Sequence, residues 1–347
     1  MSKARVTLAD VARRAGVHPT TVSVALRDSP RIPEKTRVRL KLIAEEMGYV
    51  PDPGARALAG YRGNTNAPRS VIPIGYITNW HTRWGWKEVT AHPDFFEGAS
   101  QRAAELGLSI EHFWLREPGL THGRLSQILD SRGITGIIIA SHVREIDEEL
   151  QFAWERFSAV KIDYFPHFPE LAMVTSDQMN AVRIAVQRAL AAGYRRIGFV
   201  MDDGYDITVD RLWSAGFVWE QQAIHPADRI PAYMIPGNAP LNEWIREHRP
   251  DVIIGKAEWV LPTLNGMGLA VPRDMSFIDV FLEDATGELA GVRQNHCSVG
   301  AAAVDILSGL IRHNSRGIPE IPIRTLIEGT WVDGRSLPGR HAVSRTR

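Results

Sequence analysis

The chain has 347 residues, with 40 basic and 40 acidic side chains. That length suits a small domain joined to one large or two medium domains. No run of about 18 apolar residues is present, and the N-terminus MSKARVTL lacks the apolar segment of a secretory signal, so we expect a cytoplasmic protein without a membrane span. The single cysteine, Cys297, excludes a disulfide within the chain and is expected to be a small buried side chain at a helix start.

Residues 7–27 predict two short helices joined by a tight turn. Thr7 can cap the first helix, with Asp10 completing a capping box. Gly16 ends that helix, and Pro19 suits the first turn of a second one. This is the helix-turn-helix arrangement, whose second helix can enter the major groove of DNA. The residues expected to face outward from this second helix are Thr20, Thr21, Ser23, Val24 and Arg27.

A third helix is predicted from about Pro33 to Met47, followed by a short helix at 52–59 and a Gly/Asn/Pro linker at 60–70. The helix at 52–59 is too short to persist alone in water. The apolar residues expected to close a small three-helix core from the third helix are Val38, Leu40, Ile43, Ala44 and Met47.

Four segments in this order resemble the headpiece of the LacI/GalR family of bacterial transcription regulators: TLADVARRAGV, TTVSVAL, PEKTRVRLKLIAEEMGYVP and DPGARALAG. The resemblance implies an all-α DNA-binding headpiece at 1–50 and a hinge helix with linker at 51–70. It also implies a homodimer on a pseudo-palindromic operator, with Leu58 wedged into the minor groove. Besides the outward-facing residues, the implied DNA contacts are Thr7, His18, Pro19, Arg31, Thr36, Ala55 and Leu58.

The base-reading positions depart from the family pattern. Pro19, Thr20 and Val24 stand at these positions, and Val24 replaces what is often an arginine in the family. Valine cannot hydrogen-bond to guanine and offers only apolar contact, for example with a thymine methyl group. His18 stands where the family usually has a capping Ser or Thr, so it could cap the helix, contact a phosphate or be a plain surface histidine.

Charge favours DNA binding by the N-terminal part. Residues 1–62 hold 12 Lys and Arg against 6 Asp and Glu, so the remaining residues carry a net negative charge. A basic head on an acidic body is expected where only the head meets phosphates.

The body at 71–337 alternates strand-like and helix-like patterns, which predicts parallel sheets covered by helices on both faces. The strands of the first half are expected at 71–79, 108–115, 136–141 and 159–165, and its helices at 95–107, 123–133 and 145–156. The pattern restarts at 173–203 and continues through 211–224, 241–248, 251–269 and 276–282. Two doubly wound subdomains resemble the periplasmic-binding-protein-like effector domain of the same family. We assign them to 71–165 with 293–325 and to 166–292 with 326–337, leaving a basic tail at 338–347.

Ligands of open α/β sheets bind beyond the carboxyl ends of the strands. The resemblance implies that Arg211 binds effector oxygens and that Asp177 contributes a carboxylate, although Asp177 could instead cap the next helix. Lys256 and Phe281 replace polar residues that are frequent in the family, so no known family effector can be copied onto this chain. The candidate effector residues are Asn79, Trp80, Trp84, Trp86, Asp177, Arg211, Lys256, Trp259 and Phe281.

Tryptophan points to the ligand class. Trp80, Trp84 and Trp86 crowd the segment NWHTRWGW after the first strand, and flat rings suit sugar faces, although each ring could instead be core. We therefore expect a ligand-responsive regulator, most simply a repressor, with a carbohydrate effector. The alternative is a sugar receptor of periplasmic-binding-protein type without a DNA-binding role.

No catalytic or metal-binding pattern emerges from the sequence. Ser, His and Asp fall in no elbow or triad spacing, and His142, His167 and His225 are scattered. We expect no enzyme activity, no cofactor and no metal.

Overall fold

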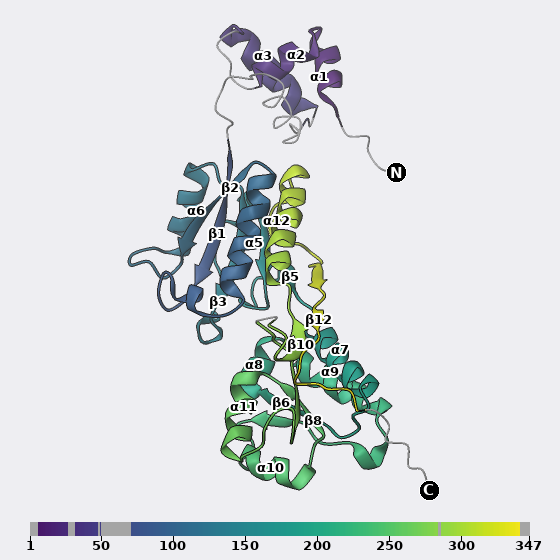
Figure 1. The fold of residues 1–347 in the computed structure, drawn as a ribbon. Coiled ribbons are helices and arrows are strands. Elements are labelled where there is room, and N and C mark those ends of the chain that lie inside the picture. The colour runs from purple at the N-terminus through teal and green to yellow at the C-terminus, as the bar shows by residue number, and fades with distance from the viewer. Residues whose placement is uncertain (1–5, 27–31, 48, 50–70, 284–285, 341–347) are drawn as a thin grey trace. The chain divides into compact units, whose positions relative to one another are not determined.

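The computed structural model describes residues 6–26, 32–47, 49, 71–283 and 286–340. The chain divides into a first unit within residues 1–70 and a second unit that holds nearly all of the rest (Figure 1). The hinge segment at 51–70 and the last residues of the tail, 341–347, lie outside the described residues. Among the described residues, no helix combines the length and apolar character needed to cross a membrane.

The first unit is a three-helix bundle of α1 (Leu8–Ala15), α2 (Pro19–Ala25) and α3 (Glu34–Glu46). The capping box at the start of α1 is confirmed, because the amide of Asp10 donates to Thr7 Oγ1 at 3.3 Å and the amide of Thr7 donates to Asp10 Oδ2 at 2.9 Å. Gly16 ends α1 with a φ of 69°, a conformation that glycine adopts without strain. The buried core consists of Val11, Ala12, Val22, Ala25, Leu40 and Ala44.

Val38 differs from the expectation, since it is 53% exposed. The buried stripe of α3 runs through Leu40 and Ala44, which lie four residues apart on one face. Val38 precedes Leu40 by two residues, so it lies on the opposite side of the helix.

The first sheet of the second unit is entirely parallel, with strand order β11-β5-β4-β3-β1-β2. Its strands are β1 (Ile72–Asn79), β2 (Leu108–Trp114), β3 (Gly136–His142), β4 (Ser158–Ile162), β5 (Ala172–Ser176) and β11 (Arg324–Ile327). Helices α5 (His92–Glu105) and α12 (His296–Arg312) lie side by side on one face, and α6 (His122–Ser131) covers the other (Figure 1). We call this sheet with its three helices the first subdomain.

The second sheet has the order β12-β10-β9-β8-β6-β7, in which only β12 runs antiparallel to its neighbour. Its strands are β6 (Ile197–Asp202), β7 (Tyr233–Ile235), β8 (Val252–Gly255), β9 (Ser276–Asp279), β10 (Ala290–Arg293) and β12 (Thr330–Val332). Its helices are α7 (Gln178–Ala191), α8 (Asp203–Thr208), α9 (Leu212–Glu220), α10 (Leu241–His248) and α11 (Ala257–Gly266). Helices α7 and α9 pack on one face, whereas α10 and α11 pack on the other, and together they form the second subdomain.

The chain crosses between the two subdomains three times, after β5, after β10 and after β11. The first crossing differs from the boundary expected at residue 165. Strand β5 does not begin the second sheet, because it pairs with β4 and β11 in the first. The restart of the alternating pattern therefore comes one strand later than the sequence pattern indicates.

The helix expected at 145–156 is wrong. Only the 3₁₀ turns Arg144–Ile146 and Trp154–Arg156 form there. Leu150, Phe152 and Trp154 are buried at alternate positions, which is the periodicity of an extended segment rather than of a helix.

Candidate functional site

Helix α2 presents the polar residues expected at a DNA groove. His18 is its N-cap, and His18 Nδ1 accepts a hydrogen bond from the backbone amide of Thr20 at 3.3 Å. The Thr20 hydroxyl also contacts His18 Nδ1. Of the three roles considered for His18, the structure shows capping. Pro19, Thr21, Ser23 and Val24 are partly exposed along the same helix, while Thr36 is partly exposed near the start of α3.

Several basic residues of the first unit make contacts within it, and one of them is Arg37, which donates from Nη1 to the carbonyl of Ile32 at 3.3 Å. Arg39 donates from Nη2 to the carbonyl of Ala15 at 2.9 Å, which satisfies the C-terminal end of α1. Arg13 lies 3.2 Å from Asp10. The remaining DNA-contact candidates, Arg27, Arg31, Ala55 and Leu58, lie outside the described residues.

The second unit contains a cavity of about 690 Å³ lined by both subdomains. Its lining follows the carboxyl ends of the parallel strands, as open α/β sheets dictate. Trp80 follows β1 and Asp163 follows β4 in the first subdomain, while Lys256 follows β8 in the second. Arg144 and Gly204 join the two sides, because Arg144 Nη1 donates to the Gly204 carbonyl at 3.0 Å. We call this volume the effector cavity.

Aromatic rings form much of its wall. The ring centroids of Trp80 and His92 lie 4.9 Å apart with an edge-to-face geometry. On the other side, the Lys256 ammonium lies 5.1 Å from the Phe281 ring centroid and 5.5 Å from that of Tyr205. Its charge is also paired with Glu258 at 2.9 Å. Lys256 is thus held in place by its surroundings.

Three polar atoms of the lining are buried without a hydrogen-bond partner in the described part of the chain: His142 Nε2, Ser176 Oγ and Trp213 Nε1. Each of these residues is more than nine-tenths buried. A buried polar group without a partner costs about 1–3 kcal/mol, so such groups call for an explanation. A ligand that carries hydroxyl groups would satisfy them.

Burial shifts the pKa of four groups that line the effector cavity toward the neutral form. Burial lowers the pKa of His92 and of His296 to about 4, and that of His142 to about 3. Burial also raises the pKa of Asp163 to about 6, opposed by the hydrogen bond from Thr175. Neutral imidazoles can both donate and accept hydrogen bonds, as recognition of hydroxyl groups requires.

Backbone strain is concentrated beside the effector cavity. Ala91, Ser141 and Asp163 all line it and have φ angles of 83°, 54° and 65°. Non-glycine residues adopt this region rarely, and such residues cluster at binding sites. The strained backbone places Ser141 so that its hydroxyl lies 3.2 Å from His92 Nδ1.

Three of the nine predicted effector residues line the effector cavity, namely Trp80, Lys256 and Phe281. Asn79 is buried and donates to Glu148 Oε1 at 3.2 Å. Asp177 takes the alternative role considered above, because it caps α7 by accepting from the Asn180 amide at 2.9 Å.

The other three tryptophans predicted to bind the effector pack against side chains of the protein instead. Trp86 is fully buried among aromatic rings, and Trp259 packs on the core of the second subdomain. Trp84 is 47% exposed, with its ring centroid 4.6 Å from that of His112. None of these three lines the effector cavity.

Arg211 also lies outside the cavity lining. Its Nη1 is 2.7 Å from Asp203 Oδ1, and its side chain is 55% exposed. Its φ of 57° places it in the left-handed region at the start of α9.

Several lining residues escaped the sequence reasoning. Asp163 could have been found, because it directly follows a strand of the first sheet. Gln294 likewise directly follows β10, but the sequence pattern did not predict that strand, and His92 and His296 carried no signal because each begins a helix.

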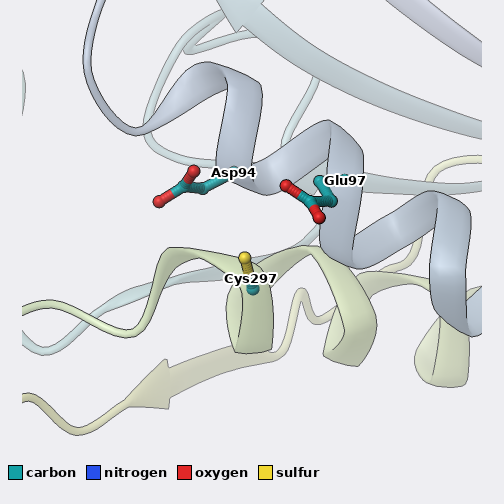
Figure 2. A group of neighbouring side chains, drawn as sticks. All are labelled: Asp94, Glu97 and Cys297. Carbon is teal, nitrogen blue, oxygen red and sulfur yellow. The ribbon is translucent and has the colours of Figure 1, made fainter.

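The structure also brings together three side chains that the sequence keeps far apart. Asp94 and Glu97 of α5 lie beside Cys297 of α12, with one ligand atom of each within 4.8 Å of the others (Figure 2). All three are exposed, so Cys297 is not the buried side chain expected at this helix start. Helix α12 does begin there, at His296.

Comparison with known proteins finds a matching family model in each of the two units of the chain. Residues 7–52 match the family model of bacterial regulatory proteins of the lacI family, and residues 186–337 match a periplasmic binding protein-like domain. The HTH-type transcriptional regulator IpsA of Corynebacterium glutamicum is 26% identical over 78% of this chain and 81% of its own length. The HTH-type transcriptional regulator TreR of Salmonella typhimurium is 27% identical over 65% of this chain and 67% of its own length.

Solved structures agree on the fold. A complex of the transcriptional regulator CelR with cellobiose has a TM-score of 0.55 and 20% identity, covering 96% of this chain and 100% of CelR. The Lac repressor dimer bound to operator and the anti-inducer ONPF has the same TM-score and coverage at 19% identity. The relatives are transcription regulators rather than enzymes. The chain thus combines a lacI-family helix-turn-helix domain at residues 7–52 with a periplasmic binding protein-like domain, and its relatives are bacterial DNA-binding transcription regulators.

Proposed function

We propose that the protein is a dimeric repressor whose binding to a pseudo-palindromic operator is controlled by an uncharged sugar in the effector cavity. The observation that carries the sugar assignment is the pairing of aromatic walls with the buried, unpartnered atoms of His142, Ser176 and Trp213. Sugars offer apolar faces to rings and hydroxyl groups to polar atoms.

The charge of the lining favours an uncharged ligand. Five acidic residues line the effector cavity, against two basic ones, Arg144 and Lys256. Lys256 is paired with Glu258, which leaves four acidic residues of the lining against Arg144. A sugar acid or sugar phosphate would meet an excess of negative charge here.

The relatives support this ligand class. One solved relative holds cellobiose, and another relative is named a maltose regulon regulatory protein. Control would follow from a population shift between two arrangements of the subdomains, in which the sugar binds one arrangement better than the other. The hinge segments of the two protomers would then separate or approach, which loosens or tightens operator binding.

The experiment that tests the proposal is a thermal-shift screen of the full-length protein against neutral sugars, sugar acids and sugar phosphates. A bound ligand raises the melting temperature by mass action. We expect a neutral sugar to give a shift and to change operator affinity in a gel-shift assay. A sugar that stabilises the protein but leaves operator affinity unchanged would contradict the control mechanism.

Operator binding is expected to depend steeply on salt. The basic N-terminal part would displace counterions from phosphates, and six to ten phosphate contacts lower affinity by about 10³–10⁵-fold between 50 and 200 mM salt. Fluorescence anisotropy with DNA from upstream of the protein's own gene, over a salt series, measures this slope. A flat salt response would contradict binding through the basic unit.

Trp80 and Trp84, which lie in one segment, provide a test variant and a matched control for sugar binding. Trp80→Ala is expected to weaken sugar binding up to about tenfold, because a ring contact contributes about 0.5–1.5 kcal/mol beyond its buried area. Trp84→Ala serves as the control, since Trp84 does not line the effector cavity. Calorimetry with the sugar that the screen returns measures both. Equal affinity of Trp80→Ala and the parent would remove the stacking role.

A further inference from the structure

A second hollow, of about 340 Å³, lies on the first subdomain and shares no residue with the lining of the effector cavity. It is formed by β2, α6 and the loop between them, together with Arg83. We call it the arginine hollow. Its volume is at the low end of the range of about 300–1,000 Å³ typical of small-molecule sites.

The arginine hollow is basic although the body around it is acidic. Three arginines line it, Arg83, Arg124 and Arg132, against the single acid Glu117. Arg132 is paired with Glu111 at 2.7 Å, while Arg83 approaches Glu117 only to 3.8 Å. Within the described ranges, no acidic side chain lies within ion-pair distance of Arg124. Two of the three arginines thus have an acidic partner, and the charge of Arg124 is left uncompensated among the described residues.

The lining of the arginine hollow also includes apolar side chains and one polar atom without a hydrogen-bond partner among the described residues. Phe113, Leu120 and Ile128 contribute apolar surface beside the arginines. His112 also lines the hollow, and its Nδ1 is buried without a partner in the described part of the chain, while its Nε2 lies 2.9 Å from Thr78 Oγ1. An arrangement of cations around an apolar floor fits an organic anion better than a bare ion.

We propose that the arginine hollow binds the phosphate monoester of a small metabolite. Guanidinium groups hold phosphate oxygens through paired hydrogen bonds, and a phosphate monoester carries nearly two negative charges at neutral pH. The lining arginines outnumber their acidic partners by one, so the hollow attracts an anion. The apolar side chains accommodate the organic part, and the volume of about 340 Å³ suits a ligand of about one ring.

Contacts of the segment after β1 link this hollow to the effector cavity. Trp84 lies beside His112, and the Arg83 guanidinium carbon is 5.9 Å from the centroid of the Trp84 ring. Trp80 of the same segment lines the effector cavity, and its carbonyl accepts a bond from Trp114 Nε1 at 2.9 Å. A ligand that engages Arg83 is therefore expected to change tryptophan fluorescence.

The test uses the full-length protein with phenyl phosphate as the probe, monitored by calorimetry and tryptophan fluorescence. The double variant Arg83→Gln/Arg124→Gln is expected to lose at least tenfold in affinity. The matched control is Arg156→Gln, an exposed arginine of the same subdomain that does not line the hollow, and it should bind as the parent does. Melting temperatures close to that of the parent establish that the variants fold.

Each outcome decides the proposal. Loss of binding in the double variant with full binding in Arg156→Gln supports it, as does the absence of binding by phenol. Equal affinity of the parent and the double variant would place the anion elsewhere, for example on the basic N-terminal unit, and overturn it. If inorganic phosphate binds as tightly as phenyl phosphate, the organic part of the ligand contributes nothing, and the proposal of an organic ester is overturned. If phthalate binds more tightly than phenyl phosphate, the hollow prefers carboxylates, and the proposal of a phosphate ligand is overturned. No arm involves a sugar or DNA, so failure here leaves the proposed function intact.

Discussion

Gly300→Ala is expected to destabilise the second unit by about 3 kcal/mol, because no space exists for the added methyl group. A Cβ at this position would lie 2.0 Å from the Phe95 carbonyl oxygen and 2.8 Å from the Ala99 nitrogen. Both are backbone atoms of α5, which packs directly on α12, so neither can rotate away. The two helices would have to separate, and their buried side chains would lose contact with one another in the core of the first subdomain.

Gly309→Ala is the matched control on the same helix. A Cβ there meets nothing within 4 Å, so the substitution should stabilise the protein slightly, by about 0.4–1 kcal/mol, through reduced freedom of the unfolded chain. Urea denaturation followed by circular dichroism measures both variants. Equal denaturation midpoints for Gly300→Ala and Gly309→Ala would show that α5 and α12 do not pack this closely.

Leu40→Ala is expected to abolish operator binding while leaving sugar binding intact. Leu40 is fully buried at the centre of the three-helix core, and removing such a side chain costs about 2–5 kcal/mol. A unit of this size has a marginal core, so the loss is comparable to its whole stability. Gel-shift titration of the operator and calorimetry with the sugar measure the two activities separately.

Leu42→Ala provides the comparison on α3, because Leu42 is 53% exposed. Both substitutions remove the same atoms from the same helix. A difference in operator affinity between the two variants is therefore due to the burial of Leu40. Operator affinity of Leu42→Ala should stay near that of the parent. If Leu40→Ala still binds the operator with full affinity, the three-helix core does not support the DNA-binding surface.

Local signals predicted the first unit well. The capping box of Thr7 and Asp10, the turn at Gly16 and the bounds of α3 all depend on neighbours in the sequence. Val38 was misplaced, because its apolar character alone does not say which side of the helix faces the core.

Most of the parallel strands were also predictable, although β7, β10 and β11 were not expected, and the assignment of strands to sheets was not predictable. Strand β5 resembles the start of a new unit by pattern, and only its pairing with β4 and β11 places it in the first sheet. Strand β11 lies far from β5 in the sequence, so the pattern of neighbouring residues cannot show that the two strands pair.

The lining of the effector cavity could be predicted where strand ends determine it, as for Trp80 and Lys256. The tryptophans of one short segment could not be told apart, since Trp80 lines the cavity, Trp84 is half-exposed and Trp86 is core. Their different surroundings come from β2 and α5, which contribute His112 and Phe96 as neighbours. Such neighbours become visible only after the chain has folded.

The three crossings between the subdomains have a consequence for biosynthesis. The first subdomain requires α12 and β11, which lie more than a hundred residues after β5. While the ribosome makes the intervening second subdomain, the outer edge of β5 is unpaired and α5 lacks the helix that packs on it. The subdomain that is begun first thus stays incomplete until β11 has been made, and the nascent chain exposes an open sheet edge until nearly all of it has emerged.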